Sequence, residues 1–395
     1  MKGASMAIYT NACLLSHGSK WRGMLQYKDP TTGKWRKKSK VLKNTGKRAA
    51  QKELEEWRAE EEEKAQAEAA AGPHAAQTVN EYVTVYIEGK KPQVEPSTYR
   101  EYRRLQAKLI EPTLGNVLLA ELNPDAVRAW IAALSEEYAP STCKKGLTLL
   151  RSCMSQAIDN DILSKDPTRG VKPPRGGRPR PNALDLDGIK TLLSVIDVAG
   201  LTPATLGIEI ALFTGLRKGE ICALRWKDID LENHALTVES AIGRGEEGFY
   251  IKAPKTGESA RTVYYSDLLA NALEQRLEEV KAAFVGAGIP FNRECFVLGG
   301  IDGSYLSTNA LGKRWEAMAE ALELKGTRGT RPTFHDLRHT YATQAIAAGI
   351  DVKAVSAQLG HSNAAMTLNT YADATKQQKQ NAARIMGERL GGLLE

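Results

Sequence analysis

Apolar and polar residues alternate near the start of the chain in the period of a β-strand. The alternation covers residues 21–28, a turn-forming segment covers 29–33, and a strand pattern resumes over 35–41. From residue 47 to about residue 71 the composition changes to Ala, Glu, Lys and Gln, which predicts a 25-residue helix. We therefore expect an N-terminal three-stranded sheet, with one strongly basic face, followed by a helix.

Helical spacing of apolar residues dominates the next segment, from about residue 78 to 169. Val79, Tyr82, Val83 and Tyr86 recur at intervals of three and four. Further helices are predicted to start at the N-cap Ser97 and reach Ile110, at Asn123 and reach Tyr138, and at the N-cap Ser141 and reach about Asn160. Four helices in so short a segment predict a compact bundle.

Residues 172–181 break the helical pattern. Six of these ten residues are Pro or Gly, and four are positively charged with no negative charge among them. Such a composition is typical of a semi-extended linker. Beyond it, the chain is predicted to be mostly helical with strands over 235–241, 249–253 and 260–264, and with residues 254–258 as the hairpin turn between the last two strands.

These patterns predict a multidomain protein that is mainly α with small β elements. The expected parts are the β module with its helix, a helical bundle, a basic linker and a mixed α+β domain with a C-terminal tail: residues 1–72, 77–170, 171–182 and 183–395. Composition agrees with a globular chain, since 42% of the 395 residues are hydrophobic and 26% are charged. No apolar run approaches the ~18 residues that a membrane span needs, so we expect no membrane association.

The cysteines and the distribution of charge indicate the cellular compartment and the class of binding partner. The five cysteines include no C-x-x-C pair, which argues against a disulfide framework and a zinc cluster and favours a reducing cytoplasm. The net charge of +7 is concentrated locally, because residues 1–50 contain 12 Lys or Arg and one acid, Asp29. A polyanion partner such as DNA would explain this concentration, although a solvated basic tail would also have it.

Candidate chemistry begins in the motif T-G-L-R-K-G-E at residues 214–220. An apolar helix ends at Gly215, and Arg217 and Glu220 share one face of the next helix, a spacing that is also common for surface ion pairs. Lys255 lies in the P-K-T turn, where a lysine often only adds solubility.

A second dense motif is H-D-L-R-H at residues 335–339. His335 and Arg338 share a helix face, and the spacing of His335 and His339 could bind zinc. A zinc protease helix needs Glu after the first His, whereas this chain has Asp336, so we expect no metal. His361 in L-G-H-S-N and Tyr371 in N-T-Y follow. Charged groups in such apolar segments are costly to bury without an anionic partner.

Together these motifs, in this order, resemble the tyrosine recombinase (phage integrase) family over about residues 185–385. The helical segment before them resembles the family's core-binding domain, and the basic β module resembles the arm-binding domain of integrases from temperate phages and conjugative transposons. The resemblance implies a site-specific DNA recombinase that cleaves and rejoins DNA through a 3′-phosphotyrosyl intermediate, integrating and excising a mobile element without a metal ion, ATP or another cofactor.

The resemblance also implies roles for individual residues. Tyr371 would attack the phosphate, and Arg217 and Arg338 would hold its non-bridging oxygens. Lys255 would protonate the leaving 5′-oxygen, His335 would assist deprotonation of the tyrosine, and His361 would hydrogen-bond the phosphorane. Glu220 would orient Arg217, and His339 would be structural.

Double-stranded DNA, at core and arm sites, is the implied partner of a homotetramer, with an excisionase and a DNA-bending host factor as further candidates. The expected DNA contacts are basic residues of the β module and linker: Arg22, Lys34, Arg36, Lys37, Lys38, Lys40, Arg175, Arg178 and Arg180. We expect a bacterial cytoplasmic protein associated with the nucleoid. Alternatives that use related chemistry or the same fold are a chromosome or plasmid dimer resolvase, a type IB topoisomerase-like nicking-closing enzyme, and a non-catalytic DNA-binding regulator.

Overall fold

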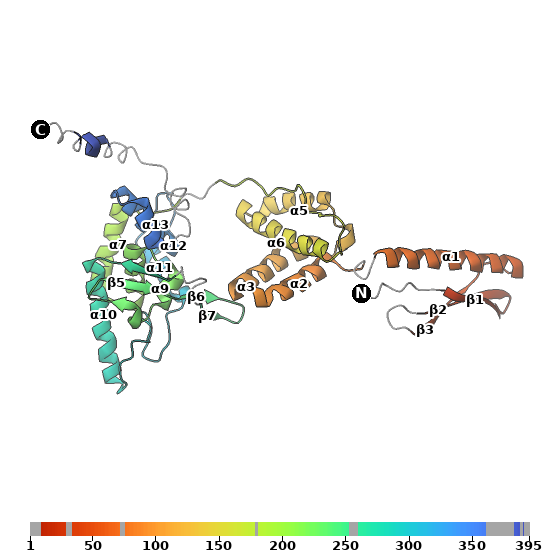
Figure 1. Cartoon of the computed structure of the whole chain (residues 1–395), viewed down its shortest axis with the longest axis horizontal. Coiled ribbons are helices and arrows are strands. Elements are labelled where there is room, and N and C mark those ends of the chain that lie inside the picture. Colours follow the sequence, from red (N-terminus) through yellow and green to blue (C-terminus); the bar gives the residue numbers. More distant parts are fainter. Residues whose placement is uncertain are drawn as a thin grey trace. The chain divides into compact units, whose positions relative to one another are not determined.

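The structure is a computed structural model of the full chain that describes residues 9–28, 34–71, 76–177, 181–252, 260–360, 383–387 and 390 (Figure 1). The chain divides into two compact units, Met1–Gly176 and Gly177–Glu395. The division falls inside the Pro- and Gly-rich segment 172–181. Each unit has hydrophobic clusters of its own.

Three antiparallel strands and one long helix begin the first unit. The strands pair in the order β1-β2-β3, and the elements are β1 (Tyr9–His17), β2 (Lys20–Lys28), β3 (Trp35–Val41) and α1 (Lys47–Ala71). α1 lies along one face of the sheet (Figure 1), and Leu25 packs there against Leu54 and Trp57. The approach is close, because a Cβ at Gly23 would lie 2.8 Å from Leu54 Cδ1. The predicted sheet and helix are confirmed.

A helical bundle completes the first unit. Its α-helices are α2 (Val79–Lys90), α3 (Pro96–Leu105), α4 (Glu111–Leu114), α5 (Pro124–Glu137) and α6 (Pro140–Asp159), with short 3₁₀ turns at Lys91–Gln93 and Leu119–Glu121. Buried side chains from these helices form one cluster that includes Tyr82, Leu147 and Met154. Within the cluster Trp130 Nε1 donates a hydrogen bond of 2.8 Å to the Leu109 carbonyl.

Two helix boundaries in the bundle differ from prediction. Ser97 and Ser141 are not the N-caps; the N-caps are Glu95 and Ala139, two residues earlier, and the helices begin at Pro96 and Pro140. Proline has the φ angle of a first helical residue already fixed and lacks the N–H that would go unsatisfied there, so it sets the start. The first of these helices also continues beyond Ile110, because a π-helical turn over Gln106–Ile110 leads directly into α4.

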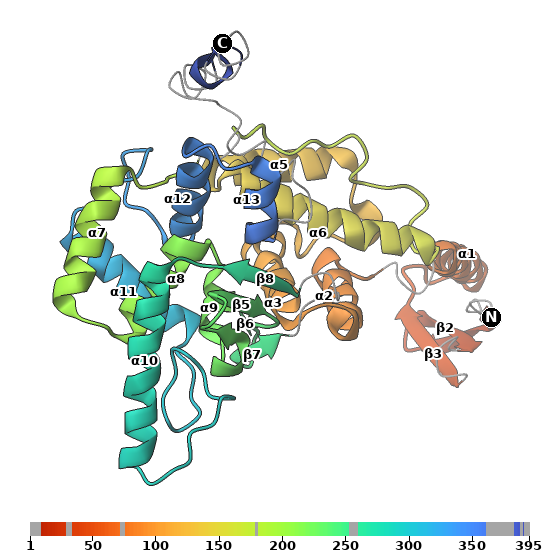
Figure 2. The same cartoon turned by 60° about the vertical axis from the view of Figure 1, so that its left-hand side comes forward.

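The second unit is mainly helical, with a small β region. The helices are α7 (Leu186–Ala199), α8 (Pro203–Thr214), α9 (Lys218–Ala223), α10 (Asp267–Gly286), α11 (Thr308–Ala321), α12 (Phe334–Ala347) and α13 (Val352–Leu359). α8 is apolar on nearly every side, and it packs against α10, α11 and α12 (Figure 2). It therefore forms the centre of the largest hydrophobic cluster.

The strands of the second unit form two small antiparallel sheets among the described residues. They are β4 (Ile229–Asp230), β5 (Ala235–Val238), β6 (Ala241–Arg244), β7 (Phe249–Lys252) and β8 (Arg261–Tyr264), in the orders β4-β5-β8 and β6-β7. A 3₁₀ turn at Trp226–Asp228 precedes them.

Two strand predictions were wrong. The segment 235–241 contains the whole of β5 and the first residue of β6, and β7 pairs with β6 rather than with β8. β7 finds its partner through the four-residue connection that follows β6, which is a shorter loop to close than the one leading to β8. In the described ranges no helix is both long and apolar enough to cross a membrane.

Candidate active site

Arg217 lies at the junction of two helices. α8 ends at Gly215, which has φ +69°, and Arg217 then has the extended backbone of an N-cap at the start of α9. Glu220, three residues on, accepts hydrogen bonds of 2.9 Å from both the backbone N–H and Nη1 of Arg217. The local sequence thus fixes both the backbone and the side chain of this arginine. The Arg217 side chain is still 45% exposed, which leaves it accessible to a ligand.

Arg338 reaches the same junction from α12. Its residue exposure is 3%, and Nη1 donates a 2.8 Å hydrogen bond to the carbonyl of Gly215. Gly215 is two residues before Arg217, so this single bond joins the T-G-L-R and H-D-L-R-H motifs in space. A charged guanidinium at such burial is stabilised by the carbonyl end of α8, where the helix dipole is negative.

Two glycines with left-handed backbones supply the carbonyls that hold the arginines. Gly215 ends α8, and Gly360, with φ +66°, ends α13 and accepts a 3.3 Å hydrogen bond from Arg217 Nη2. A Cβ at Gly215 would lie 2.5 Å from Leu359 Cδ2 and 2.7 Å from Tyr341 Cδ1. Glycine is therefore required at position 215 by both its φ angle and the close packing.

Glu220 is the acidic centre of the cluster. Its side chain is 8% exposed, and besides Arg217 it binds Arg261 of β8, whose Nη2 and Nη1 donate bonds of 2.9 and 3.2 Å. Burial alone would raise the pKa of the Glu220 carboxyl, but the hydrogen bonds and charges of Arg261 and Arg217 outweigh it and hold the pKa below its ordinary value. The carboxylate is therefore charged at neutral pH.

His335 lies on α12 one turn before Arg338. Burial lowers the pKa of the His335 imidazole below its ordinary value, and the charges of His339 and Arg338 add to this effect. Arg217 acts on the pKa of His335 in the same sense, which places it within electrostatic reach of this ring. The His335 and His339 rings meet edge to face with centroids 5.0 Å apart. At neutral pH His335 is therefore an uncharged imidazole that can accept a proton.

Lys255, His361 and Tyr371 lie outside the described residues, as do Arg178 and Arg180 of the linker. The described structure brings together Arg217, Glu220, His335 and Arg338. In the described part of the chain there is no group of three His, Cys, Asp or Glu residues that could hold a metal ion.

The sequence pattern did not indicate a role for Arg261. It is the first residue of β8, and alternation along a strand indicates only which face a residue takes, not whether a buried carboxylate meets it. Its position six residues after Lys255 was the one available signal.

The basic residues of the N-terminal sheet do not share one face, contrary to prediction. Lys38 is opposite Leu25 in the register, so it lies on the side that α1 covers, and it forms an ion pair with Glu61 of α1. Lys40 is on the same side, with its Nζ 5.9 Å from the ring centroid of Trp57. Lys37 is opposite Gln26 and lies on the open face. Side chains alternate along a strand, so consecutive lysines must divide between the two faces.

Alternation places the other predicted DNA contacts in the same way. Arg36 shares the covered side with Lys38, Arg22 shares the open face with Lys37, and Lys34 precedes β3 and is exposed. Arg175 in the linker is exposed as well.

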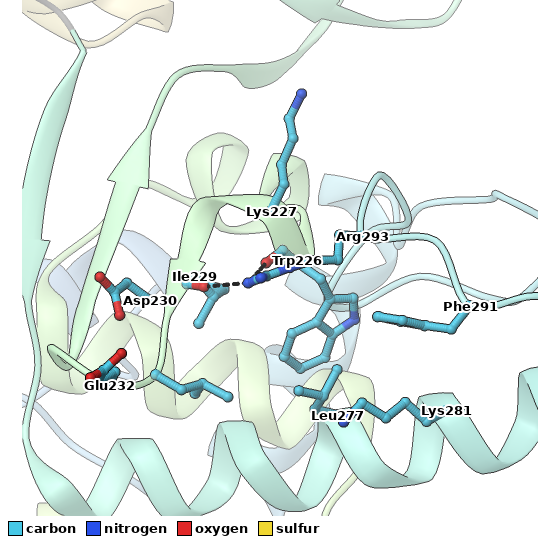
Figure 3. Close-up of a pocket in the computed structure, with 10 residues that line it drawn as sticks. Trp226, Lys227, Ile229, Asp230, Glu232, Leu277, Lys281, Phe291 and Arg293 are labelled. Carbon is cyan, nitrogen blue, oxygen red and sulfur yellow. Dashed lines mark hydrogen bonds between the residues drawn. The ribbon is translucent and has the colours of Figure 1, made fainter.

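A cavity of about 530 Å³ lies elsewhere in the second unit, beside β4 and α10 (Figure 3). Its lining includes Trp226, Leu277 and Phe291, and Arg293 Nη2 crosses one side to donate to the carbonyls of Trp226 and Ile229. Neither arginine of the candidate site, nor His335, lines it.

Known protein families and relatives match the parts of the chain that contain these arginines and histidines. The profile of the Phage integrase family matches residues 182–378, and that of the phage integrase N-terminal SAM-like domain matches residues 78–135. The integrase of Mycobacterium phage D29 is 28% identical over 346 residues, which cover 85% of this chain and 84% of that protein.

Solved structures of integrases are also similar to this chain. The Tn1549 transposon integrase in complex with a circular intermediate DNA has a TM-score of 0.66 at 25% identity, covering 79% of this chain and 99% of that one. A lambda integrase tetramer bound to a Holliday junction shares the fold, with a TM-score of 0.56 at 18% identity over 89% of this chain and 95% of that one. With its motifs, its fold and these matches in agreement, the chain belongs to the phage integrase family of tyrosine-type site-specific DNA recombinases.

Proposed function

We propose that Arg217 and Arg338 hold the scissile phosphate of one DNA strand while Tyr371 attacks it. The observation that carries this proposal is the 2.8 Å hydrogen bond from Arg338 Nη1 to the Gly215 carbonyl, two residues from Arg217. It ties two guanidinium groups from distant motifs to one helix junction. Two planar, permanently charged forks at one place suit a phosphodiester, whose non-bridging oxygens gain charge as the phosphorane forms.

The proposed reaction exchanges one phosphodiester for another. The Tyr371 hydroxyl attacks phosphorus, the bond from phosphorus to the 5′-oxygen breaks, and a 3′-phosphotyrosyl link forms. His335, uncharged at neutral pH because its pKa is lowered, takes the phenolic proton, and Lys255 gives a proton to the leaving 5′-oxygen. His361 donates to the phosphorane. Attack by a 5′-hydroxyl from a partner strand reverses the steps and rejoins the DNA, so the energy of the bond is retained.

We propose double-stranded DNA as the partner, bound at core sites by the bundle and second unit and at arm sites by the N-terminal module. The Tn1549 and lambda integrases were solved with DNA, the latter as a tetramer on a Holliday junction, and we propose the same assembly for this chain. The functional parts would follow the boundaries 1–72, 77–170, 171–182 and 183–395. An excisionase and a DNA-bending protein would then set the direction, in the bacterial cytoplasm at the nucleoid.

The test of this site uses a duplex that carries the element's own core site with a nick beside the scissile phosphate, which traps the covalent adduct. Tyr371→Phe should bind this duplex and form no adduct, whereas the control Tyr264→Phe, at an exposed tyrosine of the same unit, should form the adduct at the wild-type level. An adduct in Tyr371→Phe would overturn the nucleophile assignment.

A topoisomerase-like activity is separated by a second pair of assays. An integrase recombines two attachment sites, while a nicking-closing enzyme relaxes supercoiled DNA that has no such site.

Removing residues 1–72 should abolish recombination of full attachment sites and leave cleavage of the core duplex largely intact. Equal loss of both activities would contradict an arm-binding role for the N-terminal module.

A further inference from the structure

Arg261 connects three parts of the second unit that lie far apart in the sequence. From its position at the start of β8 it donates two hydrogen bonds to the Glu220 carboxylate of α9 and a 3.2 Å bond from Nε to the Gln358 carbonyl near the end of α13. It also lies under the turn that ends α13, because a Cβ at Gly360 would lie 2.7 Å from the Arg261 guanidinium carbon.

The two contacts of Arg261, with Glu220 and with the end of α13, each connect it to Arg217. Glu220 holds the backbone and Nη1 of Arg217, and the carbonyl of Gly360 accepts from Arg217 Nη2. Arg261 therefore binds Glu220 and packs against Gly360, the two residues that hold the Arg217 side chain, without a hydrogen bond to Arg217 itself among the contacts that the structure describes.

Burial separates the roles of the two arginines. The Arg217 side chain is 45% exposed and the Arg261 side chain is 13% exposed, with its nitrogens directed at Glu220 and Gln358. Arg217 is thus open to a DNA phosphate, while Arg261 has its donors engaged by protein. A carboxylate as buried as Glu220 is stable only with full compensation, and Arg261 provides two of its hydrogen bonds.

We infer that Arg261 is a positioning residue for strand cleavage, which sets the Arg217 guanidinium by holding Glu220 and the α13 turn in place. This inference rests on the proposed function of Arg217. It requires the planar fork of arginine, since a lysine in its place offers a single ammonium that cannot bind both carboxylate oxygens and the Gln358 carbonyl in the same geometry.

The experiment measures the single-turnover rate of adduct formation on the nicked core duplex, at saturating full-length protein. Arg261→Lys should lower this rate about 10- to 100-fold, the size of effect that a displacement of about 1 Å produces at a reacting centre. The affinity for the duplex should change less than about twofold, because the binding surface is unaltered. The matched control is Arg276→Lys, since the Arg276 side chain is 14% exposed and donates to the carbonyls of Val297 and Gly299.

A double-mutant cycle with Arg217→Lys separates positioning from general destabilisation. If Arg261 acts through Arg217, adding Arg261→Lys to Arg217→Lys should lower the rate less than about threefold further, whereas Arg276→Lys should have the same factor in both backgrounds. Glu220→Gln, which approaches the same contact from its acidic partner, should be non-additive with Arg217→Lys in the same way.

Failure of the proposed function of Arg217 and failure of the positioning role of Arg261 give different results. If Arg217→Lys leaves the cleavage rate unchanged, the proposed function of Arg217 fails. If Arg217→Lys slows cleavage but Arg261→Lys behaves as Arg276→Lys does, or the effects of Arg261→Lys and Arg217→Lys multiply independently, then the positioning role of Arg261 is overturned while the proposed site stands.

Discussion

Replacing Gly215 by alanine tests whether the helix junction that holds both arginines is as tightly constrained as the structure indicates. The left-handed backbone at φ +69° costs a non-glycine residue about 1–2 kcal/mol. The added Cβ would meet Leu359 and Tyr341 at 2.5 and 2.7 Å, and overpacking of this kind costs about 1–3 kcal/mol. We therefore expect Gly215→Ala to destabilise the second unit by about 2–5 kcal/mol.

A matched variant separates the two contributions. Gly349, after α12 in the same unit, has φ +87°, and a Cβ there would meet no atom within 4 Å. Gly349→Ala should therefore cost only the backbone term, and the two variants should differ by about 1–3 kcal/mol, or about 5- to 150-fold in the opening equilibrium.

Thiol labelling at Cys222 measures this opening in the full-length protein. Cys222 is fully buried in the core of the second unit, and burial raises the pKa of its thiol to about 12, so the folded state protects it from alkylation. The labelling rate in native buffer, resolved by mass spectrometry of the Cys222 peptide, reports opening of that unit alone. Equal labelling rates in Gly215→Ala and Gly349→Ala would refute the claim that Leu359 and Tyr341 restrict the junction.

Three further predictions concern other parts of the chain. Burial and neighbouring charges lower the pKa of His335, so the stabilising preference for its neutral form is present above pH 6.5 and is lost as the pH falls through the folded value. Cleavage should therefore decline on acidification with a midpoint below pH 6.5, and a midpoint at or above 6.5 would be inconsistent with this. In the N-terminal module, Lys37→Ala should reduce the slope of log affinity against log salt for arm-site DNA by about 1. The neighbouring variant Lys38→Ala loses an ion pair with Glu61 on the covered face and should leave this slope unchanged. Equal slopes for both variants would contradict the assignment of the two lysines to opposite faces of the sheet. In the bundle, Gln106 Nε2 donates hydrogen bonds of 2.8 and 2.7 Å to Asn80 Oδ1 and Thr84 Oγ1. Gln106→Leu should therefore destabilise the first unit by about 1–3 kcal/mol in urea unfolding. An unchanged unfolding midpoint would show that these buried hydrogen bonds contribute nothing to stability.

Local sequence determined the features that depend on local chemistry. The run over Lys47–Ala71 became a helix with the predicted bounds, since it is built from strong helix formers. Gly215 ended α8, as predicted, and it did so in the left-handed conformation that glycine adopts readily. The arginines were found because their motifs repeat an order of residues that a whole family shares.

Features that depend on long-range contacts were not predicted. The pairing of β7 with β6 was missed because strand patterns carry no information about partners. Arg261 was missed because its role depends on Glu220, 41 residues away, and on the end of α13. The lysines of β3 were assigned to one face because their charge was considered without the period of the strand.

The central claim is that Tyr371 becomes linked to a DNA phosphate held by Arg217 and Arg338. Its most direct test traps the adduct of the full-length protein on the nicked core duplex, digests protein and DNA, and identifies by mass spectrometry the peptide that carries the 3′-phosphate. We expect the modification on Tyr371 in the wild-type protein and its loss in Arg338→Ala. A phosphate on any other residue, or an undiminished adduct in Arg338→Ala, would contradict it.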